Sequence, residues 1–197
     1  MATAAGRFHA LPVSGGVWLI TGAQASGKST VAELLAERFD RSVHIRGGQF
    51  YRWAVRGWVH FDDPDQPDEA RTLLQLRYRL SALVATEYAR AGFTAVVQDN
   101  IYGPDVADWL SGVTTGPRHL VVLRPSVETV AARHEERRWR TGKIAFRGAF
   151  TPAENDAQVG RTPHLGLWVD TSRLSARETV AEILARADEA VVPDPLP

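Results

Sequence analysis

The stretch Gly22-Ala23-Gln24-Ala25-Ser26-Gly27-Lys28-Ser29 fits the pattern G-x-x-x-x-G-K-[ST] and stands between the apolar run of residues 17–20 and an amphipathic segment. In this pattern the glycines allow a tight turn whose backbone N–H groups surround phosphate oxygens. Lys28 supplies a positive charge to the β- and γ-phosphates, and the Ser29 hydroxyl ligates Mg²⁺. The pattern therefore predicts a nucleoside triphosphate site rather than a glycine-rich turn that only caps a helix. The residues assigned to it are Gly22, Ala25, Ser26, Gly27, Lys28, Ser29 and Thr30, with Lys28 as a catalytic group and Ser29 as a metal ligand.

Length and composition favour one α/β domain. The chain has 197 residues, and its 23 acidic and 23 basic side chains balance, so we expect neither a nucleic-acid nor a membrane partner. Cysteine is absent, which excludes disulfides and thiolate metal sites and favours a cytoplasmic location. No apolar run approaches the roughly 18 residues that span a bilayer, and the first 16 residues lack a signal-peptide core. The sequence leaves the oligomeric state open.

Short apolar runs alternate with helical patterns along the chain, which predicts an α/β fold with a five-stranded parallel sheet and helices on both faces. We expect strands at residues 17–21, 42–45, 94–98, 119–123 and 166–169. The domain is expected to cover residues 16–190. Residues 1–15 and 191–197 are expected to be flexible, because neither end carries a helical or strand pattern.

Several helices are expected between these strands. Residues 30–39 follow the phosphate loop, another helix begins near Ser126, and the pair Ser175 and Glu178 forms a capping box for the last helix. A long helix is expected at residues 68–90, where apolar side chains recur at helical spacing. The side chains of this stripe, predicted to be core, are Leu73, Leu76, Leu80, Leu83 and Val84.

Asp99 directly follows an apolar strand, as does the carboxylate of the second NTPase motif. We predict that Asp99 is a catalytic and metal-binding group; the alternative is an ordinary turn residue at a strand end. Asn100 and Tyr102 come next, before Gly103 and Pro104 break the chain. This loop should lie at the carboxyl edge of the sheet, where ligands bind, so Asn100 and Tyr102 are predicted to contact the substrate.

A basic cluster follows the fourth strand and runs toward Thr141 and Gly142. Phosphoryl transfer develops charge that arginines on a closing lid can stabilise by bidentate hydrogen bonds. Arg137 and Arg140, three residues apart on one helical face, are the predicted catalytic pair, and Arg133 is assigned to the nucleotide. The alternative is a solvated helix face paired with its own glutamates. The cluster consists of Arg133, Arg137, Arg138, Arg140, Lys143 and Arg147.

The segment after the second strand is where the acceptor of a small-molecule kinase would enter. Packing of its aromatic residues against the long helix is an equal alternative. Downstream, Asp62 and Asp63 are candidates for a general base or for substrate binding, against the alternative of a solvated turn. The residues predicted to bind the acceptor here are Arg46, Gly48, Gln49, Arg52 and Trp53.

These motifs together resemble those of P-loop phosphotransferases similar to chloramphenicol phosphotransferase, within the wider group of shikimate, gluconate and nucleoside monophosphate kinases. The resemblance rests on the phosphate loop, residues 44–47, residues 99–104, the arginine-rich segment and residues 163–172. It implies a P-loop NTPase fold of the nucleotide-kinase type with an arginine-rich lid at about residues 137–155. It also implies ATP and Mg²⁺ as cofactors, transfer of the γ-phosphate to a hydroxyl group, and an adenine near Thr171 and Ser172.

One position departs from the resemblance. Related antibiotic phosphotransferases carry an aspartate after the second strand that accepts the hydroxyl proton, and the corresponding residue here is Gly48. Asp62, Asp63 and Asp99 are the candidates to replace it. Three functions therefore stay open: a phosphotransferase acting on a small molecule such as an antibiotic or another secondary metabolite, a nucleotide-binding regulatory protein with weak or no transfer, and a nucleoside or nucleotide kinase. The sequence names neither the acceptor nor the preference for ATP over GTP.

Overall fold

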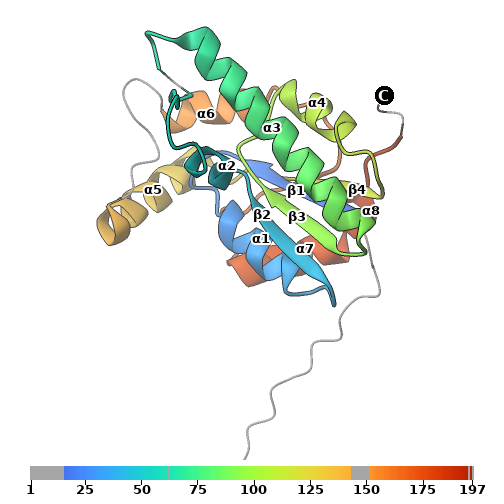
Figure 1. Cartoon of the computed structure of the whole chain (residues 1–197). Coiled ribbons are helices and arrows are strands. Elements are labelled where there is room, and N and C mark those ends of the chain that lie inside the picture. The colour runs from blue at the N-terminus through green and yellow to red at the C-terminus, as the bar shows by residue number, and fades with distance from the viewer. Residues whose placement is uncertain (1–15, 62, 143–150, 195, 197) are drawn as a thin grey trace, which may run out of the picture.

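Five parallel strands form one sheet in the order β2-β3-β1-β4-β5 in the computed structural model, which describes residues 16–61, 63–142, 151–194 and 196 (Figure 1). The predicted strands are confirmed, each end within one residue of its expected place. The strands are β1 (Gly16–Gly22), β2 (Ser42–Arg46), β3 (Thr94–Gln98), β4 (Arg118–Leu123) and β5 (Leu167–Val169).

Alternate residues of the sheet bury against helices on its two faces. Val17 and Leu19 of β1 point to the face covered by α3 (Pro67–Arg90) and α4 (Asp105–Ser111). Trp18 and Ile20 point to the opposite face, covered by α1 (Lys28–Ala36) and α7 (Ala176–Ala185), as Figure 1 shows. This double covering explains why the strands are near-continuous apolar runs. The remaining helices are α2 (Gly48–Arg52), α5 (Val127–Thr141), α6 (Pro152–Val159) and α8 (Ala187–Ala190).

Side-chain caps begin three of the described helices, α5, α6 and α7. The Ser126 hydroxyl accepts from the N–H of Thr129 at the start of α5. Ser175 and Glu178 form the predicted capping box of α7, and Thr151 and Glu154 form a second one at α6. The capping pattern at α6 was present in the sequence but lay inside the segment expected to be a lid, and neither α4 nor α6 was predicted.

The prediction for the buried face of α3 was wrong for Leu76 and Leu83, although Val84 of the same stripe does pack against the core. Leu76 and Leu83 are 40% and 55% exposed. The face toward the sheet carries Tyr78, Ala82 and Ala85 instead, with Leu74 and Val84 partly buried beside them. Small alanines let a helix backbone approach a sheet closely, so helical spacing of leucines alone did not identify the buried face.

The segment after α8, predicted to be flexible, lies along β4. Val192 is buried and donates its backbone N–H to the Arg118 carbonyl (2.8 Å), and Val191 bridges His119. Arg118 also reaches Asp194 at 3.0 Å. The chain after α8 is thus extended and pairs with the start of β4. Residues 1–15 lie outside the described part of the chain, and none of the described helices is long and apolar enough to cross a bilayer.

Candidate functional site

The phosphate loop connects β1 to α1 through backbone conformations that the sequence dictates. Gly22 and Gly27 have φ values of 136° and 95°, in the region that favours glycine. A Cβ on Gly22 would lie 2.1 Å from the carbonyl oxygen of Leu123 on the neighbouring strand β4. Ala25 also has a positive φ, 61°. These turns present the start of α1 toward a cavity at the carboxyl edge of the sheet.

Lys28 is buried within the loop. Its Nζ donates to the carbonyl oxygens of Gly22 (2.9 Å) and Ala23 (2.5 Å). Burial lowers the pKa of Lys28 to about 7; the nearby Arg137 and Arg77 also lower it, and Asp99 opposes them. The amine thus stands at a point where phosphate oxygens would replace backbone carbonyls and hold its charge.

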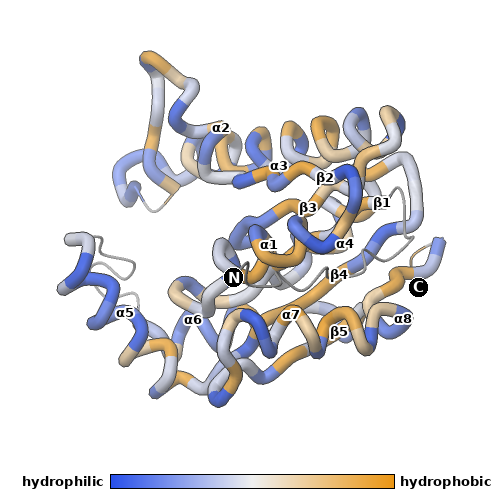
Figure 2. The backbone as a smooth tube through the Cα atoms, turned by 90° about the horizontal axis from the view of Figure 1, so that it is seen from below, coloured by the Kyte–Doolittle hydropathy of each residue, from blue (hydrophilic) through white to orange (hydrophobic). Residues whose placement is uncertain are grey.

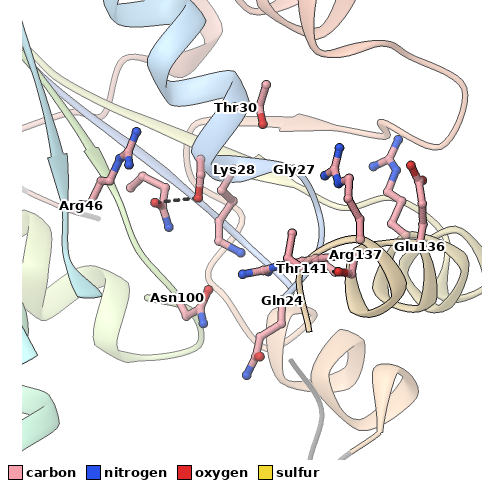
Figure 3. A pocket seen from close by; sticks show the side chains of 14 residues that line it. Gln24, Gly27, Lys28, Thr30, Arg46, Asn100, Glu136, Arg137 and Thr141 are labelled. Atoms are coloured by element: carbon pink, nitrogen blue, oxygen red, sulfur yellow. Dashed lines mark hydrogen bonds between the residues drawn. The ribbon is translucent and has the colours of Figure 1, made fainter. Parts of the chain in front are cut away.

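A cavity of about 600 Å³ opens above the loop (Figure 3). Arg137 extends from α5 toward Lys28, and Arg46 and Asn100 contribute from the ends of the sheet. Seen from below, the C-terminal half of α5 is hydrophilic and projects beyond the sheet (Figure 2). Predicted residues that line the cavity are Ala25, Gly27, Lys28, Ser29, Thr30, Arg46, Asn100, Arg133, Arg137 and Arg140; unpredicted ones are Gln24, Gln98, Glu136 and Thr141.

Ser29 and Gln98 form the part of this cavity suited to a divalent cation. The Ser29 hydroxyl donates to Oε1 of Gln98 at 3.0 Å, the contact dashed in Figure 3. Both side chains offer neutral oxygens, and Mg²⁺ usually takes few protein ligands beside phosphates and water. The donor set therefore fits a nucleotide-bound Mg²⁺, although the described residues contain no cluster that would hold a metal by itself.

The Asp99 carboxylate forms an ion pair with Arg77. It is buried, and Arg77 of α3 binds both of its carboxylate oxygens, with Nε 2.8 Å from Oδ2. The Asn100 N–H adds a bond of 2.7 Å, and a Cβ on Gly47 would lie 1.9 Å from Oδ2. Asp99 lines neither cavity described here, and its role as a metal ligand stays a prediction. Nothing in the local sequence marked Arg77 as its partner.

A second cavity of about 340 Å³ adjoins the first, and Gln24 and Asn100 line both. Tyr102, predicted to contact the substrate, lines it too. Its other walls come from α3, α4 and α6, which the sequence did not connect to a site. The unpredicted lining residues are Gln24, Phe61, Arg71, Leu74, Arg77, Tyr78, Asp105 and Gln158.

Asn155 of α6 joins the phosphate loop to the second cavity. It is fully buried; its Oδ1 accepts from the Gln24 N–H (2.8 Å), and its Nδ2 donates to the Tyr102 hydroxyl (3.0 Å). On the other side of the loop, Arg133 donates to the carbonyl oxygens of Thr171 (2.7 Å) and Ser26 (3.4 Å). These bonds hold the loop from both flanks, and a buried amide with both ends satisfied fixes one geometry.

Other predicted residues line neither cavity. Ser172 accepts the Ser126 N–H at 2.8 Å, which supports the start of α5. Asp63 accepts the Asp65 N–H in a turn, the alternative that the sequence left open for it. Asp62 lies outside the described residues, as do residues 143–150 of the expected lid. The predicted residues that line neither cavity are Gly22, Ser26, Gly48, Gln49, Arg52, Trp53, Asp63, Asp99, Thr171 and Ser172.

There is room for a Cβ at Gly48, the position where the resemblance leads us to expect an aspartate. A Cβ added to Gly48 would meet no atom within 4 Å. Within the described ranges, the carboxylates that line the cavities are Glu136 in the first and Asp105 in the second.

Comparisons with known proteins agree with this geometry. A family model described as AAA domain matches residues 17–148. No curated protein matches the sequence. Many solved structures are similar to the chain, and they include the following three. One is a sugar kinase from Janibacter sp. HTCC2649, with 18% identity, a TM-score of 0.58, and coverage of 89% of this chain and 96% of that one.

The second is a gluconokinase from Sinorhizobium meliloti 1021, with 20% identity, a TM-score of 0.55, and coverage of 89% and 93%. The third is a tunicamycin resistance protein from Deinococcus radiodurans, with 17% identity, a TM-score of 0.61, and coverage of 91% and 99%. At these identities the likeness shows a shared fold, and it confirms the predicted P-loop, kinase-like α/β architecture. The narrower resemblance to chloramphenicol phosphotransferase stays a prediction.

Proposed function

The chain belongs to the AAA domain family, and we propose that it is an ATP-dependent phosphotransferase that moves the γ-phosphoryl group to a hydroxyl of a small molecule. The observation that carries this proposal is the pair of adjoining cavities, which share Gln24 and Asn100. One has the phosphate loop at its base, and the other is a separate chamber for a second reactant. A protein that only binds a nucleotide has no need of the second chamber.

The transfer breaks the bond between the γ-phosphorus and the β–γ bridging oxygen and forms a bond to the acceptor oxygen. ADP leaves with the electron pair, and the hydroxyl proton passes to a carboxylate or to water. Lys28 holds the phosphates, and Arg137 and Arg140 face the same cavity to neutralise charge on the transferred group. Ser29 and Gln98 would hold Mg²⁺, which neutralises charge on the β- and γ-phosphates when bound.

The absence of an aspartate at Gly48 does not by itself remove this activity. Phosphoryl transfer has a loose transition state, so positioning and electrostatics supply most of the rate, and a general base typically contributes about 10²- to 10⁴-fold. The acceptor class is therefore the open question. The likeness to a sugar kinase, a gluconokinase and a tunicamycin resistance protein favours a hydroxylated metabolite or an antibiotic as the acceptor.

A second candidate is a nucleotide-binding regulatory protein, and the empty space beside Gly48 favours it. If chemistry has been lost there, Gly48→Asp should restore it, because a Cβ at this position meets no atom of the described residues within 4 Å. The first proposal predicts acceptor-stimulated turnover without that change. The second predicts ATP binding with turnover only in the Gly48→Asp variant.

The test is ADP release from Mg-ATP in the presence of hydroxylated antibiotics, sugars and nucleosides, with the mass of each acceptor measured afterwards. Lys28→Ala serves as the blank, and Arg138→Ala is the matched control because Arg138 already pairs with Glu135 at 3.6 Å. A gain of one phosphoryl mass in the wild type and the control, but not in the blank, supports the proposal. Equal ADP release with and without every acceptor, despite ATP binding, contradicts it.

A further inference from the structure

The second cavity contains two arginines, and each is already bound by a carboxylate. Arg71 donates from both terminal nitrogens to Asp105, at 2.9 and 2.5 Å. Arg77 donates from Nε and from a terminal nitrogen to Asp99. Bidentate pairing uses the planar fork with which arginine would otherwise grip a phosphate or a carboxylate. The charge of each arginine in this cavity is therefore balanced by a carboxylate beside it.

The Arg77–Asp99 pair cannot open for a ligand. Both side chains are buried, and the carboxylate would be left without its counter-charge in a place that water does not reach. Arg77 also lies over the ring of Tyr51 of α2, with its central carbon 4.5 Å from the ring centroid. It is therefore held from two sides as part of the floor of the cavity.

The Arg71–Asp105 pair is the more accessible of the two, since the Arg71 side chain is 48% exposed and that of Asp105 is 16% exposed. An anionic acceptor would either displace Asp105 from Arg71 or lie beside the Asp105 carboxylate, and in both cases it meets a like charge. A neutral hydroxyl can instead donate to the outer lone pairs of Asp105 while the ion pair stays intact. The pair thus favours hydroxyl groups over anions.

The rest of the wall is uncharged. Gln158 and the carbonyl and amide groups of Asn100 offer both donors and acceptors, while Phe61 and Leu74 supply apolar surface. Burial raises the pKa of Tyr78 and of Tyr102, which keeps both phenols neutral. A lining of amides, phenols and apolar carbon suits a molecule with several hydroxyl groups and an apolar face.

We propose that the acceptor is an uncharged, hydroxyl-rich molecule, and that the Arg71–Asp105 pair excludes acceptors that carry a phosphate or a carboxylate. This inference rests on the proposed function, because it takes the second cavity as the acceptor site. It also divides the third function left open by the sequence, a nucleoside or nucleotide kinase, into two cases. A neutral nucleoside is compatible with the cavity, and a nucleoside monophosphate is not.

The test compares the binding of uridine and uridine 5′-monophosphate to the full chain, with the first cavity filled by Mg²⁺ and a non-hydrolysable ATP analogue. The wild type should bind the monophosphate no more tightly than uridine. Asp105→Asn frees Arg71 and should raise the affinity for the monophosphate about tenfold or more. Asp40→Asn makes the same charge change away from both cavities and should leave the affinity unchanged.

Adding Arg71→Gln to Asp105→Asn should cancel the gain, and thermal melting of each variant shows that it is folded. A wild type that binds the monophosphate about tenfold more tightly than uridine overturns the inference. So does an Asp105→Asn variant that folds and shows no gain in affinity for the monophosphate. Failure of the proposed function looks different, because there no hydroxyl compound stimulates ADP release although Mg-ATP binds.

Discussion

The Ser29 hydroxyl donates to the side-chain oxygen of Gln98, 3.0 Å away, across the start of α1 and the end of β3. In P-loop enzymes a carboxylate from a strand end usually shares Mg²⁺ with this hydroxyl. Here the neighbour is a neutral amide, and the carboxylate one residue later, Asp99, is held by Arg77. The metal would therefore be held mainly by the nucleotide.

The charge at residue 98 should therefore determine how much Mg²⁺ is needed for nucleotide binding. Gln98→Glu should lower the Mg²⁺ concentration for half-maximal nucleotide binding about three- to tenfold, since a charged oxygen holds the ion more strongly. Gln98→Ala should raise it by a similar factor. The check is a Mg²⁺ titration at fixed ATP, with Gln75→Glu on the exposed side of α3 as the charge-matched control. Identical titration curves for Gln98→Glu and the wild type would refute this role.

Nucleotide binding should take up a proton near neutral pH. The pKa of Lys28 is about 7 without nucleotide, so close to half of the amines are neutral at pH 7. Phosphate oxygens favour the charged form and raise this pKa on binding. The ATP affinity should therefore be greatest below pH 7 and fall as the pH rises above it, by up to about tenfold per unit.

Calorimetry in two buffers of different ionisation enthalpy measures this uptake. Lys28→Arg keeps a full charge over the whole range and should show no uptake from this position. Proton uptake that is the same in the wild type and Lys28→Arg would mean that the nucleotide, and not Lys28, is being titrated.

The arginines of α5 should differ in their effects on turnover. Arg137 and Arg140 line the nucleotide cavity, whereas Arg138 pairs with Glu135. Arg137→Ala should lower kcat about 10²- to 10³-fold with a smaller change in the KM for ATP, as the loss of a group that stabilises transition-state charge does. Arg138→Ala should stay within a few-fold of the wild type. A similar loss in both variants would indicate a general effect of charge on α5.

Replacing Asp99 should lower the free energy of unfolding of the protein. Asp99→Asn leaves Arg77 buried without its full counter-charge and should cost about 3–5 kcal/mol of unfolding free energy in urea denaturation. Replacing the pair by Arg77→Met with Asp99→Leu should recover most of that loss. If Asp99→Asn instead kept its stability and needed more Mg²⁺, the sequence-based role of Asp99 as a metal ligand would be the correct one.

The sequence predicts what is local and misses what is assembled from distant segments. The phosphate loop, all five strands and the capping box at Ser175 depend on short stretches, and each is found where its pattern placed it. Asn155 reaches Gln24 across 131 positions, and only the folded chain brings the two together. The second cavity could not be predicted for the same reason, because its walls come from the distant helices α3, α4 and α6.

The long helix α3 shows a second limit of prediction from sequence. Its leucine stripe and its alanine face both recur at helical spacing, so periodicity alone offered two faces for burial. Close packing on the sheet selected Ala82 and Ala85 and left Leu83 exposed. Pairing of glutamates with arginines on α5, the alternative that the sequence left open, is found for Arg138 and Glu135, whereas the predicted Arg137 and Arg140 line the cavity.

The most direct measurement is phosphoryl transfer itself: Mg-ATP labelled at the γ-phosphate, a panel of neutral hydroxylated compounds, and mass analysis of each, with the wild type beside Lys28→Ala. The account predicts that at least one neutral compound gains the label and a phosphoryl mass in the wild type only. If the wild type binds Mg-ATP and labels none of them, while Gly48→Asp does, the chain is a nucleotide-binding protein whose transfer chemistry has been lost.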